Sequence, residues 1–395
     1  MKIFGKELKF KAPSQVDIVI FDECNNEYVR KSINKIYSIG IFNQRKPIDI
    51  FISFKVLISF FQNLVYFKIN EIFGHRRGII DAALTNLRRI YYKSCLDVMK
   101  PKAVITYIDN SSNFGWLSRN CKDYPFIGIQ NGSRLSYASS NKNFDYHVQH
   151  LFCYGEHEKS LFSKIGYSVN NFYPAGSLVA SLHFDLKLQS EKEIYDLLIV
   201  STWRGNIGFQ QDVKDTMKSM KIMDHLLAQY VKTRSIKAAI ILRNERDSKD
   251  WIMPEIGKSE IDYFQNIYGN SAEIIETNFS KRNIFQLMQK SKVVTTCLSS
   301  AAIEAFGIGK KILYCNFTGT NLYHSDIDKD LVTEKSNWLE FSKLMDSLIA
   351  HDPEDYRKIN KEKMNYYMSF PSDLSTHNFI SNKIDKIIER SEILN

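Results

Sequence analysis

The stretch VVTTCLSSAAIEAFGIGKKILYCN, residues 293–316, decides the fold class. It begins with an apolar, β-branched run typical of a buried strand and passes through two serines into a helix-length apolar pattern. A glycine stop and a second strand-like run follow. Strand, helix and strand in this order form the repeating unit of a parallel sheet covered by helices. Ser299 and Ser300 lie where the first strand ends, and Glu304 lies one turn further on.

The same alternation of strand-like and helix-length segments continues on both sides of this stretch, so the sequence predicts an α/β protein. The expected strands are 16–22, 102–109, 126–131, 150–155, 171–176, 197–202, 238–244, 272–278, 293–299 and 311–317. The expected helices are 81–99, 112–121, 157–165, 210–233, 283–291 and 300–307. Each half then forms its own doubly wound unit, which binds ligands beyond the carboxyl ends of its strands.

A polar, charged segment at 185–196 has no apolar stripe and predicts a linker between two domains. We expect one Rossmann-like domain over 1–185 and a second over 196–330. Helical patterns over 335–395 predict C-terminal helices, and we expect the last of them to cross back to the first domain. Parallel sheets that face a central cleft place the binding site between the domains.

Composition limits the class of protein. The chain has 395 residues, 44% of them hydrophobic, which is enough to bury a core in two domains. Six cysteines are scattered without a C-x-x-C pair, so neither a zinc site nor a disulfide framework is indicated, and a reducing cytoplasm is expected. The formal net charge of +9 fits an anionic substrate, nucleic acid or an anionic membrane surface.

The most apolar run is IDIFISFKVLISFFQNLVYFKI, residues 48–69. Lys55, Gln62 and Asn63 interrupt it, so it does not predict a membrane span. We interpret it as a strand followed by a buried helix. The alternative is a helix whose aromatic face contacts a membrane interface, through Phe60, Phe61, Tyr66 and Phe67 beside Lys55 and Lys68.

Donors suited to phosphate follow several strands of the second half. A helix start with free N–H groups and two hydroxyls, as at Ser299 and Ser300, favours an anion, although an ordinary helix cap with Glu304 near capping-box spacing is the alternative. Similar strand-end turns supply further glycine, hydroxyl or guanidinium donors, at Gly176, Ser177, Thr202, Arg204 and Arg243. Neither a G-x-G-x-x-G nor a P-loop motif is present, so a metal-independent phosphate site is expected.

Polar side chains also follow the strands of the first half. Asp109 comes directly after a buried strand and is a candidate base or nucleophile, with an N-cap for the next helix as the alternative. Glu156 and His157 open a helix and are further acid–base candidates, although acidic residues favour helix starts anyway. Side chains suited to sugar hydroxyls lie nearby, at Asn110, Gln130, Asn131, Gly132 and Arg134.

The motifs FIGIQNG, CYGE, YPAGSL and CLSSAAIEAFGIGKKILYCN together resemble the GT-B glycosyltransferases of bacterial surface-polysaccharide biosynthesis. Within that group the chain is similar to enzymes related to the retaining β-Kdo transferases. The resemblance spans roughly residues 100–317. CMP-sugar enzymes often carry a His-Pro dipeptide near the position where this chain has the segment LRNERD instead.

The resemblance implies a GT-B fold, in which the second domain binds the donor nucleotide and the first binds the acceptor. It implies a glycosyltransferase that moves a sugar, best matched by Kdo or a similar ulosonic acid from a CMP donor, to a glycan or lipid-linked glycan. O-antigen, lipopolysaccharide or capsule would be the acceptor, at the inner face of the membrane. Asp109 would be the nucleophile or base, while Ser299, Ser300 and Glu304 would hold the donor phosphate and ribose. No cofactor besides the nucleotide-sugar co-substrate is expected.

Other functions remain open at this level. A CDP-glycerol-type polyol-phosphate transferase would share the architecture and an anionic donor, and a nucleotide-sugar epimerase of GT-B shape would need no acceptor. A basic nucleic-acid-binding module is less favoured, because the aromatic residues fall within strand and helix patterns and not along an exposed basic stripe. A non-catalytic scaffold is disfavoured because polar residues recur at so many strand ends.

Overall fold

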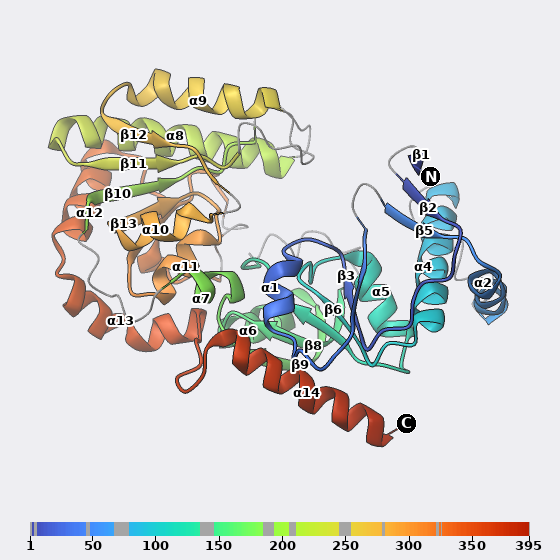
Figure 1. Ribbon diagram of the computed structural model, residues 1–395. Helices are drawn as coiled ribbons and strands as arrows, with labels where there is room; N and C mark the ends of the chain where they lie inside the picture. The colour runs from blue at the N-terminus through green and yellow to red at the C-terminus, as the bar shows by residue number, and fades with distance from the viewer. Residues whose placement is uncertain are drawn as a thin grey trace.

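The structure is a computed structural model that describes residues 2–3, 6–44, 48–66, 79–134, 146–184, 193–204, 211–244, 254–278, 281–320, 324 and 326–394. It has two lobes, each built on its own sheet of six strands (Figure 1). Every strand pair within these two sheets is parallel. This arrangement confirms the predicted α/β class with two Rossmann-like units.

The N-terminal lobe has the strand order β4-β3-β6-β7-β8-β9. The strands are β3 (Ile18–Phe21), β4 (Ile39–Phe42), β6 (Ala103–Thr106), β7 (Phe126–Ile129), β8 (His147–Cys153) and β9 (Ser168–Pro174). The helices of this lobe are α1 (Asn26–Lys31), α2 (Phe54–Tyr66), α4 (Ile79–Met99), α5 (Ser112–Asn120), α6 (Glu156–Ile165) and α7 (Leu178–His183). Strands β3, β6 and β7 are fully buried because helices cover both faces of the sheet.

The C-terminal lobe has the strand order β12-β11-β10-β13-β14-β15. The strands are β10 (Tyr195–Val200), β11 (Ala238–Ile241), β12 (Ala272–Ile275), β13 (Ser291–Thr296), β14 (Lys311–Cys315) and β15 (Val332–Thr333). The helices are α8 (Gln211–Arg234), α9 (Pro254–Tyr268), α10 (Asn283–Gln289), α11 (Ala301–Gly307), the 3-10 helix η2 (Lys329–Leu331) and α12 (Trp338–Ala350). Chain order reverses between β10 and β13, and likewise between β3 and β6 in the other lobe.

All ten expected strands and all six expected helices are present within a few residues. The elements that were not predicted include strands β4 and β15, helices α1 and α9, and a small sheet of β1 (Lys2–Ile3), β2 (Lys6–Lys9) and β5 (Ile48–Phe51), of which only β5 was expected. Most of the predicted linker, residues 185–192, lies outside the described residues, and its last two residues already belong to β10.

Helices α13 (Pro353–Tyr367) and α14 (Thr376–Leu394) follow the C-terminal lobe. Helix α14 runs beneath the N-terminal lobe (Figure 1), where the Thr376 hydroxyl donates to the Ala175 carbonyl over 3.0 Å. Near its other end, Glu392 pairs with Lys102 at 3.0 Å. The buried side chains of α14 belong to one apolar cluster that contains residues of both lobes.

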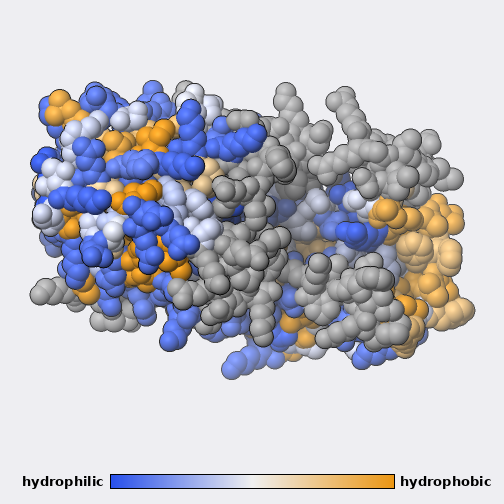
Figure 2. Space-filling view, turned by 90° about the horizontal axis from the view of Figure 1, so that it is seen from above, coloured by the Kyte–Doolittle hydropathy of each residue, from blue (hydrophilic) through white to orange (hydrophobic). Residues whose placement is uncertain are grey.

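The exposure of helix α2 corrects the interpretation of this segment as a buried helix. Its inward face is polar: the Asn63 amide donates to Asp97 on α4 over 2.8 Å and to Ser94 over 3.1 Å. Its outward face is apolar and exposed, at Phe54, Leu57, Ile58, Phe61 and Val65. Figure 2 shows hydrophobic surface gathered at the end of the N-terminal lobe where α2 lies. No helix in the described part of the chain is both long and apolar enough to cross a membrane.

Candidate functional site

The carboxyl ends of the two sheets meet at the contact between the lobes, which we call the junction. In open α/β sheets, ligands bind where chain order reverses, beyond the carboxyl ends of the two strands concerned. In the C-terminal lobe these strands are β10 and β13. The segment 201–204 follows β10 and the segment 297–300 follows β13, so Thr202, Arg204, Ser299 and Ser300 flank the reversal point.

Two arginines stand at neighbouring strand ends of this lobe. Arg204 follows β10 and Arg243 follows β11, and these strands pair directly. Burial and then repulsion by Arg204 lower the pKa of Arg243 to about 10. The Arg204 Nε atom and the Trp203 indole N–H are buried and find no acceptor among the described residues. Unused cationic and neutral donors side by side are what an anionic ligand requires.

A buried carboxylate, Glu260 on α9, shapes the loops that carry these arginines. It accepts hydrogen bonds from the Ser201 hydroxyl at 2.5 Å and from the Arg243 backbone N–H at 2.8 Å. The Asn244 side chain donates to its other oxygen over 2.6 Å. Glu260 therefore ties the ends of β10 and β11 together, and sequence analysis missed it because α9 was not predicted.

The serine pair lies on the junction. The Ser300 side chain makes no hydrogen bond to cap α11, whereas the Ser299 hydroxyl accepts from the Ala301 N–H over 3.3 Å. Gly132 of the N-terminal lobe faces Ser300, because a Cβ atom at this glycine would lie 3.4 Å from the Ser300 hydroxyl. The structure thus brings together the predicted QNG turn and the predicted serine pair.

Glu304 joins the lobes. It accepts a hydrogen bond of 2.6 Å from the Ser177 hydroxyl and one of 3.3 Å from the Tyr154 hydroxyl, and both donors belong to the N-terminal lobe. Burial raises the pKa of Glu304. The carboxylate is therefore already engaged within the protein, and the capping-box alternative is not what holds it.

The turn at Gly176 and Ser177 is packed inside the protein, which corrects its predicted availability to phosphate. The Ser177 hydroxyl caps α7 by accepting a hydrogen bond from the Ala180 N–H. The backbone N–H of Ser177 donates to the Met368 sulfur. Gly176 has φ +73°, and a Cβ atom there would lie 2.5 Å from the Phe370 ring. Both residues serve the packing of the chain that leads into α14.

Asp109 is also enclosed, which corrects the expectation that its carboxylate faces the ligand. It is fully buried and contacts the Arg134 guanidinium at 2.5 Å. The Asn131 N–H and the Tyr146 hydroxyl donate to it over 3.1 Å and 3.0 Å. The carboxylate thereby holds Arg134 and the 131–134 turn against the junction. The neighbouring cap of α5 is Ser111, not Asp109, and Asn110 is exposed.

Glu158 was not predicted and is the carboxyl group beside this pair. The Ser133 hydroxyl donates to its Oε1 over 3.3 Å, and its Oε2 has no hydrogen-bond partner among the described residues. Burial raises the pKa of Glu158 to about 7, although nearby Gln130 and Arg134 oppose the shift. A carboxyl that titrates near neutral pH suits proton transfer. Its place in the sequence, two residues after Glu156, gave no signal of this environment.

His157 is buried against α13 and the segment that holds Asp326, which corrects its expected availability to a ligand. Its ring packs against Tyr366 and Tyr367 of α13, and its Nε2 lies 3.0 Å from the Asp326 carbonyl. Burial lowers its pKa, so the ring is neutral. Glu156 is exposed at the start of α6. Gln130 spans neighbouring strands, because its amide donates to the Gly132 carbonyl and accepts from the Tyr154 N–H.

Arg282 adds a cation that sequence analysis missed. Its guanidinium donates to the Asn25 side chain, which lies beyond β3 at the reversal point of the N-terminal sheet. Its Nε atom is buried without an acceptor in the described ranges. Within those same ranges, no cluster of three His, Cys, Asp or Glu side chains is placed to hold a metal ion. The predicted independence from metals remains a prediction.

Comparison with known proteins places this architecture. The sequence matches no family model and no curated protein. The fold matches the Staphylococcus aureus MnaA–UDP structure with a TM-score of 0.53 and 15% identity, over 96% of this chain and 97% of that chain. A putative UDP-N-acetylglucosamine 2-epimerase from Listeria monocytogenes gives 0.53 and 13%, over 95% and 96%. The Methanocaldococcus jannaschii UDP-GlcNAc 2-epimerase with UDP-GlcNAc and UDP gives 0.52 and 13%, over 93% and 99%.

The fold is GT-B. The two lobes of parallel strands, with helix α14 of the second lobe packed beneath the first, match these structures along nearly their full length. At such low identity the likeness establishes the GT-B fold and not the activity. The narrower resemblance to the β-Kdo transferase group stays a prediction.

Proposed function

We propose that this GT-B protein is an enzyme that acts on a nucleotide-activated sugar and transfers the sugar to a glycan acceptor. The observation that carries the proposal is the row of donors at the reversal point of the C-terminal sheet. Arg204 and Arg243 supply charge there, and the uncapped Ser300 hydroxyl stands next along the sheet edge. Such donors stabilise the negative charge that develops on a phosphate leaving group.

The first lobe would supply the acid–base group. In transfer, the bond between the sugar carbon and the phosphate oxygen breaks, and the oxygen keeps the electron pair. The acceptor hydroxyl forms the new glycosidic bond and loses its proton, which the ionised form of Glu158 can accept because its pKa is about 7. Asp109 then acts as a positioning residue that holds Arg134 beside the sugar.

We also propose which chemical classes of donor and acceptor the enzyme uses. The resemblance stated above favours a CMP-linked ulosonic acid such as Kdo and an acceptor of the lipopolysaccharide, O-antigen or capsule type. A CDP-glycerol-type donor fits the same row of cations. The anionic donor is common to all these versions, and so is the requirement for an acceptor.

A nucleotide-sugar epimerase is the second candidate. The specific observation in its favour is the fold match to the Listeria monocytogenes and Methanocaldococcus jannaschii proteins, which are named as 2-epimerases of UDP-GlcNAc, the second with UDP-GlcNAc bound. An epimerase would convert the donor without any acceptor, and the same phosphate donors and the same Glu158 would serve it.

Nucleotide binding and turnover test these proposals. We expect one nucleotide among CMP, CDP, UDP and GDP to raise the melting temperature, because a ligand at 100 times its Kd stabilises the folded form by about 2.7 kcal/mol. The variant Arg243→Gln should lose most of that shift. Lys358→Gln, which removes an exposed charge on α13, should keep it. If no nucleotide stabilises the protein, or if Arg243→Gln responds like the wild type, the proposed donor site is wrong.

The matching nucleotide sugar then separates the candidates. A transferase releases nucleotide only when an acceptor glycan is added, whereas an epimerase changes the sugar in its absence. Glu158→Gln should abolish either reaction and leave the nucleotide-induced stabilisation intact. Full turnover by Glu158→Gln would remove this residue from the chemistry.

We further propose a cytoplasmic enzyme that rests on the membrane surface through α2. The outward face of α2 is apolar over Phe54, Phe61 and Val65, and it carries no carboxylate. The exposed charged side chains among residues 7–11 and 49–65 are Lys11 and Lys55, both basic. An apolar face flanked by lysines matches an anionic bilayer surface.

A further inference from the structure

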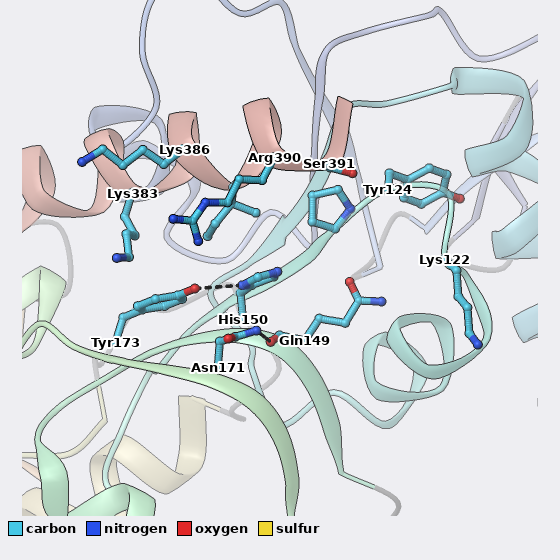
Figure 3. Close-up of a pocket in the computed structure, with 12 residues that line it drawn as sticks. Lys122, Tyr124, Gln149, His150, Asn171, Tyr173, Lys383, Lys386, Arg390 and Ser391 are labelled. Carbon is cyan, nitrogen blue, oxygen red and sulfur yellow. Dashed lines mark hydrogen bonds between the residues drawn. The ribbon is translucent and has the colours of Figure 1, made fainter. Parts of the chain in front are cut away.

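The structure contains a basic pocket that shares no lining residue with the proposed donor site. It is a cavity of about 350 Å³ between α14 and the strands β8 and β9. Three of its cations come from α14, namely Lys383, Lys386 and Arg390, and Lys122 stands at the other end (Figure 3). Of the described residues that line it, none is an aspartate or a glutamate. The pocket is therefore a concave surface with uncompensated positive charge.

The positive charge follows from how α14 divides its charged residues. Residues 383, 386 and 390 share one side of a helix with 3.6 residues per turn. Asp385 and Glu392 lie on the opposite side, where they contact Asn34 and Lys102. The buried stripe of Ile384 and Ile388 separates the two sides. Asp385 and Glu392 thus face away from the pocket, and the third carboxylate of the helix, Glu389, is exposed and is not among the residues that line it.

This division has an energetic cost in the unliganded protein. Lys386 and Arg390 are four residues apart, and like charges at this spacing repel one another on a helix surface. No ion pair in the described part of the chain offsets the charge of either residue. An anion bound between them would remove the repulsion.

The strand side of the pocket is polar and aromatic. The Tyr173 hydroxyl lies 3.1 Å from Nδ1 of His150, and their rings are stacked at an interplanar angle of 7°. The Lys383 ammonium lies 4.8 Å from the centre of the Tyr173 ring. Figure 3 shows these rings forming the floor beneath the cations of α14. The floor offers rigid contacts that a bound group can lie against.

A second cavity shows what a neutralised basic site looks like in the same protein. It has a similar volume of about 340 Å³ and is lined by Lys292, Lys310 and Lys311. Acidic residues line it too, and Lys310 pairs with Glu193 at 3.1 Å. The described lining of the basic pocket lacks such partners, so its charge is available to a ligand.

We propose that the basic pocket binds a polyanion with at least two phosphate or similar anionic groups. Lys383 and Arg390 are seven residues apart, about 10 Å along the helix axis. A single phosphate cannot contact cations over this whole length together with Lys122, whereas two or more linked anions can. The ligand could be a compact diphosphate or part of an anionic polymer, and the chemistry that recognises both is the same.

The test uses the full chain with two probes, inorganic pyrophosphate and long-chain polyphosphate. The site variant is Lys386→Gln with Arg390→Gln, at exposed helix positions where glutamine is well tolerated. The control, Lys358→Gln with Lys361→Gln, removes the same charge from exposed positions of α13. Calorimetry in the Arg243→Gln background removes binding at the proposed donor site. We expect the site variant to bind at least tenfold more weakly, and the control to bind like the wild type.

His150 gives a local readout by NMR. Burial lowers its pKa to about 4, and a bound polyanion should raise it measurably. The variant His150→Gln, which lacks the imidazole ring, assigns the signal. Tighter binding of polyphosphate with a steeper salt dependence assigns a polymer, and equal binding of pyrophosphate assigns a compact ligand. Binding that is unchanged in the site variant, or absent for both probes, would overturn the proposal.

Discussion

At the scale of single residues, the charged side chains at the junction are buried and are held by partners that follow different strands. Asp109 illustrates this arrangement, because two donors from the 131–134 turn and the Tyr146 hydroxyl converge on one carboxylate. A buried ion pair is costly to break, since the remaining charge is left without a partner or water. The position of Arg134 at the junction therefore depends on Asp109.

Removal of this carboxylate provides the first prediction. Asp109→Ala should lower the free energy of unfolding by about 3–5 kcal/mol, because it leaves the Arg134 guanidinium buried and unpaired. Denaturant unfolding measures the change. The double variant with Arg134→Met should recover part of the loss, whereas simple additivity of the two single variants would show that the pair is not coupled.

Glu158 makes stability depend on pH. Its pKa is about 7 in the folded protein against 4.5 for an ordinary glutamate, so the folded state holds its proton longer. Stability is then full below about pH 4.5 and falls as the pH rises through 7, by up to about 3 kcal/mol. Glu158→Gln should flatten this part of the curve of melting temperature against pH.

Asp224 provides the comparison for that measurement. It is buried in the C-terminal lobe with hydrogen bonds from Tyr263 and Tyr268, and burial raises its pKa to about 8. Asp224→Asn should flatten the same curve toward higher pH without affecting turnover. An unchanged pH profile in Glu158→Gln would contradict the assigned shift.

At the scale of secondary-structure elements, the chain illustrates what periodicity can and cannot predict. The strands β3, β6 and β7 were predictable because burial on both faces makes them nearly continuous apolar runs. The orientation of α2 was not, because Phe54, Phe61 and Val65 are exposed, whereas Asn63 and Ser59 form hydrogen bonds to α4. Amphipathicity defines two faces of a helix but does not say which one faces the core.

The same limit applies to the site. The location of the site at the carboxyl ends of the strands was predictable, since parallel sheets bind ligands there. Which side chains remain free was not predictable, because Ser177, Asp109 and Glu304 are used by partners far away in sequence. Glu158 and Glu260 were missed for the complementary reason that burial, not sequence pattern, gives them their properties.

The exposed face of α2 gives a prediction at this scale. The double variant Phe54→Ser and Phe61→Ser should bind anionic phospholipid vesicles at least tenfold more weakly, because each buried aromatic side chain contributes roughly 1.5–3 kcal/mol. Flotation with vesicles measures the bound fraction. A control with Leu339→Ser and Ile359→Ser changes exposed apolar residues of α12 and α13 and should bind normally. Equal flotation of all three proteins would contradict the proposed surface.

At the scale of the whole molecule, the two lobes share their interior. One cluster of buried apolar side chains contains Ile105 of β6, Ile312 of β14 and Ile384 of α14. A hydrogen bond joins Ser177 to Glu304 across the junction. Gly132 and Ser300 approach closely there. Each lobe also has an apolar cluster of its own, and the shared cluster joins the two lobes through these contacts.

The shared interior predicts cooperative unfolding. Ile384→Ala should lower stability by about 2–5 kcal/mol, the range for a buried isoleucine cut to alanine. Scanning calorimetry should show one transition that moves as a whole to lower temperature. Two separate transitions, with only one displaced, would show that the lobes unfold independently.

Helix α14 also has a consequence for how the chain matures. The isoleucines that complete the interior beneath β8 and β9 leave the ribosome only after all the strands of the second lobe have been made. At about 5–20 residues per second, the first lobe waits on the order of tens of seconds with part of its apolar surface uncovered. During that interval the nascent chain presents a natural target for chaperones. A chain truncated before α14 should aggregate more readily after its release.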